Sequence, residues 1–259
     1  MSTTAQHTSK QDLYHSVYRG RHTWLHHLSY MRVSKVMALL QMVKVHDIDL
    51  SNKAVFDYGF GAGTFFLHCP RTSALYGVEL DAVNVDAVRS TLFEKGYSCA
   101  ELAAGDECAW REHPLLSRQY DVIVISHVLE HLKEPEALLE KLMACLTDDG
   151  CLLGAVPINE PVRHDSHECT VDRDTVELWA DRAEATLVDY VELDYATRWV
   201  LPVFELKGSF GRVAAQGLSL GLGLAATAFG RRAWFALTQA AGQLVGAKPG
   251  QAVFLMRRC

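Results

Sequence analysis

Three glycines at alternate positions follow the first apolar stretch of the chain that can form a strand. The segment 55–64 carries an acid, Asp57, and then Gly59, Gly61 and Gly63. Glycines allow the backbone to turn tightly and to bring its N–H groups against a ligand without an intervening Cβ. In open α/β sheets, ligands bind at the carboxyl ends of strands. The segment therefore predicts a ligand cradle at the end of a first strand.

A second acid, Glu79, ends the next strand-like stretch. The interval between Asp57 and Glu79 fits one strand-turn-helix-strand unit, which would bring the two strand ends side by side. A carboxylate there can accept hydrogen bonds from both hydroxyls of a ribose. The dinucleotide fingerprint G-x-G-x-x-G/A is not matched, because the sixth position counted from Gly59 is Thr64. The pattern favours a nucleoside ligand over a dinucleotide.

Imidazole and carboxylate side chains follow the fourth apolar stretch. His127, Glu130 and His131 come directly after Ser126. An imidazole has an ordinary pKa near neutrality, so it can deprotonate a hydroxyl or an amine. We predict His127 and His131 as catalytic residues, with His127 the preferred general base. The alternative is that Glu130 and His131 only join the sheet end to the next helix.

Strand-like and helix-like segments alternate along the chain. Strands are expected at 54–56, 73–80, 99–103, 120–126, 151–157, within 186–200 and at 251–257, and helices within 14–45 and at 81–95, 135–146 and 172–182. Asp81 can cap the helix that stops at Gly96, and Pro70 leaves room only for a short helix after the glycines. This alternation predicts a doubly wound, seven-stranded, mostly parallel sheet in one domain over 1–259, with its cofactor-binding core at 54–200.

With these motifs in place, the chain resembles the class I S-adenosylmethionine-dependent methyltransferases. Segments 57–63, 77–79 and 104–106 resemble their first three motifs, and 128–131 resembles the Val-Leu-Glu-His signature of many small-molecule methyltransferases. The resemblance implies a Rossmann-like methyltransferase fold, closed by an antiparallel hairpin of the last two strands, with S-adenosylmethionine as cofactor. The cofactor-binding residues that it implies are Asp57, Gly59, Phe60, Gly61, Gly63, Glu79, Leu80, Asp106, Glu107 and Ser126.

The expected acceptor is a small molecule, with oxygen the favoured atom: a natural product, a quinone or a lipid-like intermediate. DNA amino-methyltransferases typically carry Asn/Asp-Pro-Pro-aromatic after the fourth strand, and Ser126-His127-Val128-Leu129 stands here instead. A net charge of −6 without a basic stripe also argues against a nucleic-acid partner.

Two alternatives stay open. The first is a metal-dependent RNA 2′-O-methyltransferase, because His127-x-x-Glu130-His131 with the later His167 resembles the divalent-metal quartet of small-RNA 2′-O-methyltransferases. The first residue of that quartet is Glu where this chain has His127, and no metal ligands are assigned on this basis. The other alternative is a protein that binds the cofactor without transferring a methyl group.

A helical insertion is expected at 205–248, before the final strand at 251–257. Its uncharged stretches 213–230 and 233–247 flank Arg231 and Arg232, and they predict a cap over the pocket or a homodimer face. Peripheral membrane contact through Trp234 and Phe235 is the alternative. The seven cysteines form no C-x-x-C pair and the first residues lack an apolar signal core, so we expect a cytoplasmic protein with free thiols.

Overall fold

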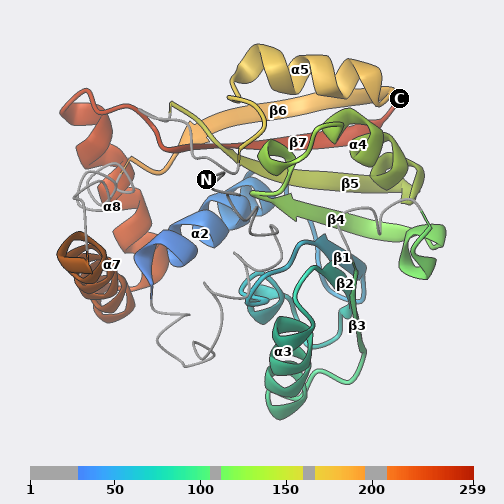
Figure 1. The fold of residues 1–259 in the computed structure, drawn as a ribbon, viewed down its shortest axis with the longest axis horizontal. Coiled ribbons are helices and arrows are strands. Elements are labelled where there is room, and N and C mark those ends of the chain that lie inside the picture. The colour runs from blue at the N-terminus through green and yellow to red at the C-terminus, as the bar shows by residue number, and fades with distance from the viewer. Residues whose placement is uncertain (1–28, 106–111, 160–166, 196–208) are drawn as a thin grey trace, which may run out of the picture.

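A seven-stranded sheet forms the centre of the computed structural model, which describes residues 29–105, 112–159, 167–195 and 209–259 (Figure 1). The strand order is β3-β2-β1-β4-β5-β7-β6. The strands are β1 Ala54–Tyr58, β2 Ala74–Glu79, β3 Ala100–Ala104, β4 Tyr120–Ser126, β5 Leu146–Pro157, β6 Ala185–Leu193 and β7 Gln251–Arg258. β1 to β5 pair in parallel, and β7 lies antiparallel between β5 and β6. The predicted fold class is confirmed, including the closing antiparallel hairpin.

Helices cover both faces of the sheet (Figure 1). They are α2 Tyr30–Val45, α3 Ala82–Glu94, α4 Pro135–Ala144, α5 Arg173–Arg182, α7 Ser209–Phe229 and α8 Arg231–Leu244, with 3₁₀ turns η2 Phe66–His68, η4 Pro114–Ser117 and η5 Leu129–His131. Alternate residues of β4 face opposite sides, as a pleated strand requires. Val122 and Val124 join the core with α2 and α3, while Ile123 and Ile125 join the core with α4 and α5.

The register of the central strands places the chemistry at one edge. Asp57 on β1 lies opposite Gly77 on β2 and opposite Val124 on β4. Because the three strands are parallel, their carboxyl ends meet at the same edge of the sheet. The glycine loop after β1, Glu79 at the end of β2 and the histidines after β4 are thereby neighbours.

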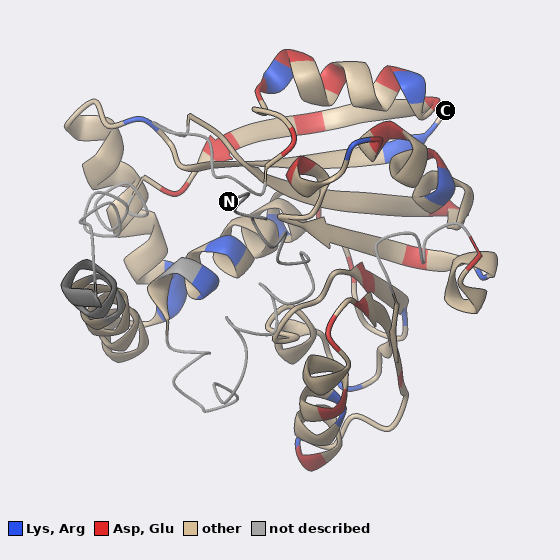
Figure 2. Cartoon of the chain, viewed as in Figure 1, with Lys and Arg blue, Asp and Glu red and all other residues tan. Residues whose placement is uncertain are grey.

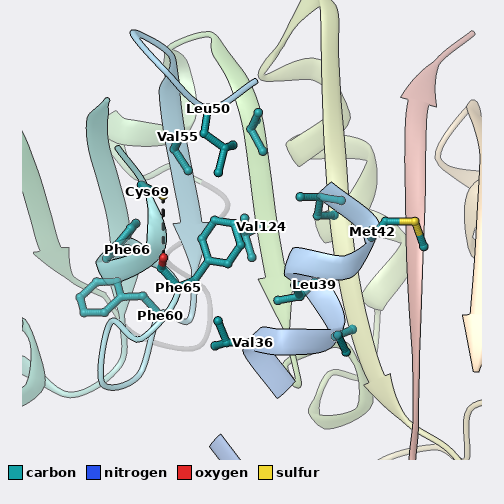
Figure 3. Packing of buried hydrophobic residues seen from close by; sticks show 14 of the residues in the cluster. Val36, Leu39, Met42, Leu50, Val55, Phe60, Phe65, Phe66, Cys69 and Val124 are labelled. Atoms are coloured by element: carbon teal, nitrogen blue, oxygen red, sulfur yellow. Dashed lines mark hydrogen bonds between the residues drawn. The ribbon is translucent and has the colours of Figure 1, made fainter. Parts of the chain in front are cut away.

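The chain after the glycine loop departs from the expected short helix. Turns lead into the three-residue η2, and no α-helix forms between β1 and β2. Pro70 ends any helix at this point, and the side chains of Phe60, Phe65 and Phe66 are buried in the core (Figure 3). In Figure 3, Val36, Leu39 and Met42 of α2 lie across from them on the same side of the sheet. Apolar burial therefore fixes this loop, rather than helical hydrogen bonding.

β5 is longer than the sequence indicates. It begins at Leu146 rather than Cys151, and α4 accordingly ends at Ala144. Leu146 pairs with Tyr120 at the start of β4, and the register shifts before Val122 pairs with Cys151. This irregularity interrupts the apolar pattern on which the sequence prediction depends. The predicted helical segment at 14–28 lies outside the described residues.

α7 and α8 pack against each other and against α2, beside the sheet (Figure 1). The Tyr30 and Thr238 hydroxyls lie 3.1 Å apart, and the Ser29 and Ser219 hydroxyls lie 3.0 Å apart, so polar contacts join α2 to both helices. Residues 217–229 of α7 include no charged side chain (Figure 2). None of the helices in the described part of the chain is long and apolar enough to cross a membrane.

Candidate functional site

The glycine loop has three left-handed residues, each with different surroundings. Gly59, Gly61 and Gly63 have φ angles of 74°, 53° and 66°. A Cβ on Gly59 would lie 2.5 Å from Val128 after β4, and one on Gly63 would lie 2.5 Å from Val88 on α3. A Cβ on Gly61 would meet nothing within 4 Å. The outer glycines therefore permit close packing, and Gly61 alone of the three borders open space.

Glu79 is buried directly beside this open position. Its Oε2 accepts a hydrogen bond of 2.6 Å from the Gly61 N–H, and its Oε1 accepts one of 3.0 Å from the Leu80 N–H. Burial raises the pKa of Glu79, although these backbone donors act in the opposite direction. Oε1 also accepts from the Asp81 N–H at 3.4 Å, so the carboxylate is held in one orientation, and Oε2 retains capacity for a further donor such as a ribose hydroxyl.

Asp57 is a second buried carboxylate at the same strand edge. Its side chain is only 4% exposed and its Oδ1 has no hydrogen-bond partner. Burial, and then the charge of Glu79, raise the pKa of Asp57 well above its ordinary value. Two desolvated acids at one edge favour a ligand that brings positive charge or hydroxyl donors, and they disfavour a pyrophosphate.

The other predicted cofactor residues divide into three groups. The Phe60 ring is packed in the core, 5.6 Å from the ring of Phe66. Phe60 therefore contributes only its backbone to the surface of the glycine loop. Ser126 ends β4 opposite Ala155 and is partly exposed. Asp106 and Glu107 lie outside the described residues.

His127 adopts a left-handed backbone, with a φ of 56°, immediately after β4. Such strain in a residue other than glycine is typical of functional sites. Its Nε2 lies 3.1 Å from Gln251 Oε1. The Gln251 amide nitrogen donates to Ser34 O at 3.4 Å and to Asp194 Oδ2 at 3.5 Å, which fixes Oε1 as the acceptor and Nε2 of His127 as the donor.

The second ring nitrogen of His127, Nδ1, lies 3.5 Å from Glu130 Oε1. Burial is the main cause that lowers the pKa of His127, and the positive charge of Lys35 acts in the same direction. Both ring nitrogens are therefore in contact with protein groups. This geometry orients Glu130 and limits the access of an acceptor to His127.

Glu130, His131 and His167 come together beside this contact. The Glu130 side chain is 1% exposed, its Oε1 lies 3.9 Å from His131 Nε2, and its Oε2 has no hydrogen-bond partner. The rings of His131 and His167 meet edge to face with centroids 4.8 Å apart. Burial alone would raise the pKa of Glu130, but the hydrogen bond and charge of His127, together with His131, lower it.

Two buried polar residues were missed by the sequence analysis. Asn84, in the first turn of α3, is completely buried, and neither polar atom of its amide has a partner. It lies on the same apolar stripe as Val88 and Leu92, so a polar residue in a buried stripe was the available signal. Gln251, the first residue of β7, had no such signal, because its partners lie far away in the chain.

Comparisons with known proteins identify the family and the fold. Residues 21–200 match a family model described as a methyltransferase domain. No curated protein matches the chain significantly. Similar solved structures include the cyclase SpnF (TM-score 0.59, 16% identity, 85% of this chain and 79% of that one) and coclaurine N-methyltransferase bound to N-methylheliamine and SAH (0.57, 16%, 85% and 71%).

Magnesium protoporphyrin IX methyltransferase from Synechocystis PCC 6803 with bound SAH is also similar (TM-score 0.54, 11% identity, 88% of this chain and 85% of that one). At these identities the structural likeness establishes the fold, whereas the family model covers more than half of the chain. The chain therefore belongs to the methyltransferase domain family, as a class I S-adenosylmethionine-dependent methyltransferase.

Proposed function

We propose that this enzyme transfers the methyl group of S-adenosylmethionine to a small-molecule acceptor, with oxygen as the methylated atom. The observation that carries the cofactor assignment is the open space at Gly61 beside the buried carboxylates Glu79 and Asp57. S-adenosylmethionine supplies a methyl group already bound to a positively charged sulfur. Its ribose hydroxyls match the remaining acceptor capacity of Glu79, and its positive charge matches the field of both acids.

A small acceptor is supported by the surface charge and by the segment after β4. The net charge of −6 opposes nucleic-acid binding, and Ser126-His127-Val128-Leu129 is unlike the segment of DNA amino-methyltransferases. Three solved structures of this fold are titled as methyltransferases of coclaurine, mitomycin and magnesium protoporphyrin IX, all of them small molecules.

Oxygen is favoured because the carboxyl end of β4 gathers groups that handle protons. A hydroxyl acceptor must lose its proton on methylation, and the partly exposed imidazole of His131 lies beside Glu130 at this edge. The contacts of His127 with Gln251 and Glu130 support a role in holding Glu130, as a positioning residue. The predicted general-base roles of His127 and His131 stay predictions.

Calorimetric titration with S-adenosylmethionine tests the cofactor assignment. Glu79→Gln keeps the shape of the side chain but loses charge-assisted hydrogen bonds, so we expect affinity to fall by about 10- to 100-fold. The matched control is Glu101→Gln on neighbouring β3, an exposed glutamate paired with Arg118, which should bind as the wild type does. A wild-type protein without affinity, or one that prefers a nicotinamide dinucleotide, would overturn the proposal.

Formation of S-adenosylhomocysteine tests the transfer and the acceptor class. The panel should contain phenols, aliphatic alcohols and carboxylic acids as oxygen acceptors, with amines of matched size as controls. We expect product with at least one oxygen acceptor and none with its amine counterpart. Tight cofactor binding without product from any acceptor would instead identify a protein that binds the cofactor without transferring its methyl group. The similar structure of the cyclase SpnF illustrates that this fold is not restricted to methyl transfer.

A further inference from the structure

The cluster of Glu130, His131 and His167 has a geometry that the cofactor site does not explain. One ligand atom from each of these residues lies within 4.8 Å of the other two. Atoms bound to one metal ion at about 2.0–2.2 Å are separated from one another by about 3–4 Å. Small rotations of the two partly exposed imidazoles therefore suffice to close the three ligands around an ion.

The backbone holds these ligands together although they come from two segments. Glu130 and His131 belong to η5, and His167 begins the described segment that leads to α5. The Glu168 N–H donates a hydrogen bond of 2.8 Å to the Glu130 carbonyl, which anchors the second segment beside the first. The approach of His167 to His131 is thus built into the fold.

Glu130 provides an independent sign that a ligand is expected. Its side chain is almost completely buried, and its Oε2 has no hydrogen-bond partner. An unsatisfied buried acceptor is costly, about 1–3 kcal/mol and more when it is charged. A cation bound by this carboxylate would offset that cost by neutralising its buried charge.

We propose that Glu130, His131 and His167 bind one divalent transition-metal ion such as Zn²⁺. Two imidazoles and one carboxylate are a ligand set that suits Zn²⁺ and its neighbours, whereas Mg²⁺ and Ca²⁺ require oxygen ligands. His127 contacts Glu130 Oε1 while its Nε2 is held by Gln251, so it supports a ligand without being one. This assigns His131 the role of a ligand rather than that of a base.

The site also indicates what the acceptor carries, a step that rests on the proposed function. Val128, which packs against Gly59 of the cofactor loop, immediately precedes η5, so the ion site adjoins the cofactor site. Three protein ligands leave at least one coordination position open. The acceptor is then a molecule with an oxygen donor, such as a hydroxyl beside a carbonyl, that coordinates the ion through that position.

Zn²⁺ titration by calorimetry tests the metal site without an acceptor or S-adenosylmethionine. The protein is the full chain without a histidine tag, carrying Cys99→Ser and Cys259→Ser to remove the two exposed thiols among the described residues, after treatment with a chelator. We expect one Zn²⁺ per chain, at least about tenfold weaker binding for His167→Ala and for Glu130→Gln, and no binding of Mg²⁺. The control, His46→Ala, removes a histidine paired with Asp189 at 2.8 Å and should bind Zn²⁺ as the parent does.

Absence of Zn²⁺ binding, or equal affinity of His167→Ala and the parent protein, overturns the metal site. His167 is partly exposed, so His167→Ala decides the question even where Glu130→Gln does not fold. Failure here together with intact S-adenosylmethionine binding refutes the metal site alone and leaves the proposed function standing.

The open coordination position has its own test. Co²⁺ replaces Zn²⁺ in the parent protein, and acetohydroxamate, which binds metals through two oxygens, is added. A change in the visible Co²⁺ spectrum, absent in His167→Ala, is expected. An unchanged spectrum in the Co²⁺-loaded parent would show that the ion has no open coordination position. This result would overturn the assignment of an oxygen-donor acceptor.

Discussion

The three loop glycines all have a left-handed backbone conformation, but a methyl group added at each would have different neighbours. Gly63 packs against Val88 on α3, whereas Gly61 faces open space and donates to Glu79. Replacing each of these two glycines by alanine should therefore separate an effect on ligand affinity from an effect on stability.

Gly61→Ala should weaken S-adenosylmethionine binding by tenfold or more while the protein stays folded. The new methyl group occupies the ligand's space, and the left-handed backbone adds a strain of about 1–2 kcal/mol. Gly63→Ala carries similar strain and a clash with Val88 besides, so it should lower the free energy of unfolding more. Calorimetry and urea denaturation of both variants provide the comparison. Equal loss of stability in the two would contradict the assigned surroundings.

The raised pKa of Glu79 predicts opposite effects of pH on binding and on stability. The ionised carboxylate accepts the ribose hydroxyls, so affinity should fall as the pH is lowered through this pKa, starting at a higher pH than for an exposed glutamate. The folded cofactor-free protein binds the proton more readily than the unfolded chain does. Protonation of Glu79 should therefore increase the free energy of unfolding as the pH falls over that range. Titrations and denaturation of wild type and Glu79→Gln at several pH values isolate both effects; a parallel pH dependence in the variant would refute them.

At the scale of elements, the strands and helices are fixed by local caps and by close contacts between strands. Asp172 is the N-cap of α5, and its carboxylate accepts from the Thr175 N–H at 2.9 Å. α5 packs on β6, while the glycine loop follows β1 on the other side of β4. Stability of this helix should therefore be separable from cofactor binding.

Asp172→Ala should lower the free energy of unfolding by about 1 kcal/mol and leave S-adenosylmethionine affinity unchanged. Urea denaturation and calorimetry measure the two quantities. Asp174→Ala, two residues into the same helix, is the control, because it removes an acid from the first turn but not the cap. A loss of affinity in Asp172→Ala would mean that α5 is coupled to the site.

Gly154 on β5 illustrates the second kind of constraint. A Cβ there would collide with the ring of Phe254, its partner on β7. We expect Gly154→Ala to lower the free energy of unfolding by about 1–3 kcal/mol, and Phe254→Leu to restore part of that loss when combined with it. A double-mutant cycle in urea measures the coupling, and additive effects would argue against the contact.

At the scale of the whole molecule, cofactor binding should stabilise the fold by mass action. Ligand at 100 times its Kd contributes about 2.7 kcal/mol, which raises the Tm of a protein of this size by about 5–10 °C. Thermal unfolding with increasing S-adenosylmethionine measures the rise, and Glu79→Gln should require more ligand for the same shift. A Tm indifferent to the ligand in the wild type would conflict with cofactor binding. The predicted homodimer face, membrane contact and cytoplasmic location stay predictions.

Local patterns in the sequence determined the order and kinds of the elements. The Asp81 cap, the glycine spacing and the alternation of apolar segments predicted α3, the loop and the succession of strands along the chain, because each depends on interactions between chain neighbours. The same patterns predicted Asp57, Glu79 and the histidines after β4 as site residues, and the family that they resemble is confirmed.

Which of these groups are in contact depends on the tertiary structure. Two contacts join segments far apart in the chain: that of His127 with Gln251 and that of His131 with His167. The open space at Gly61 likewise depends on how the surrounding segments pack. Nothing in local periodicity selects such contacts, because their geometry is set by the packing of the whole sheet and its helices. Local patterns were therefore enough to predict the fold and, through the family that they resemble, the cofactor, whereas the contacts among the site groups depend on packing.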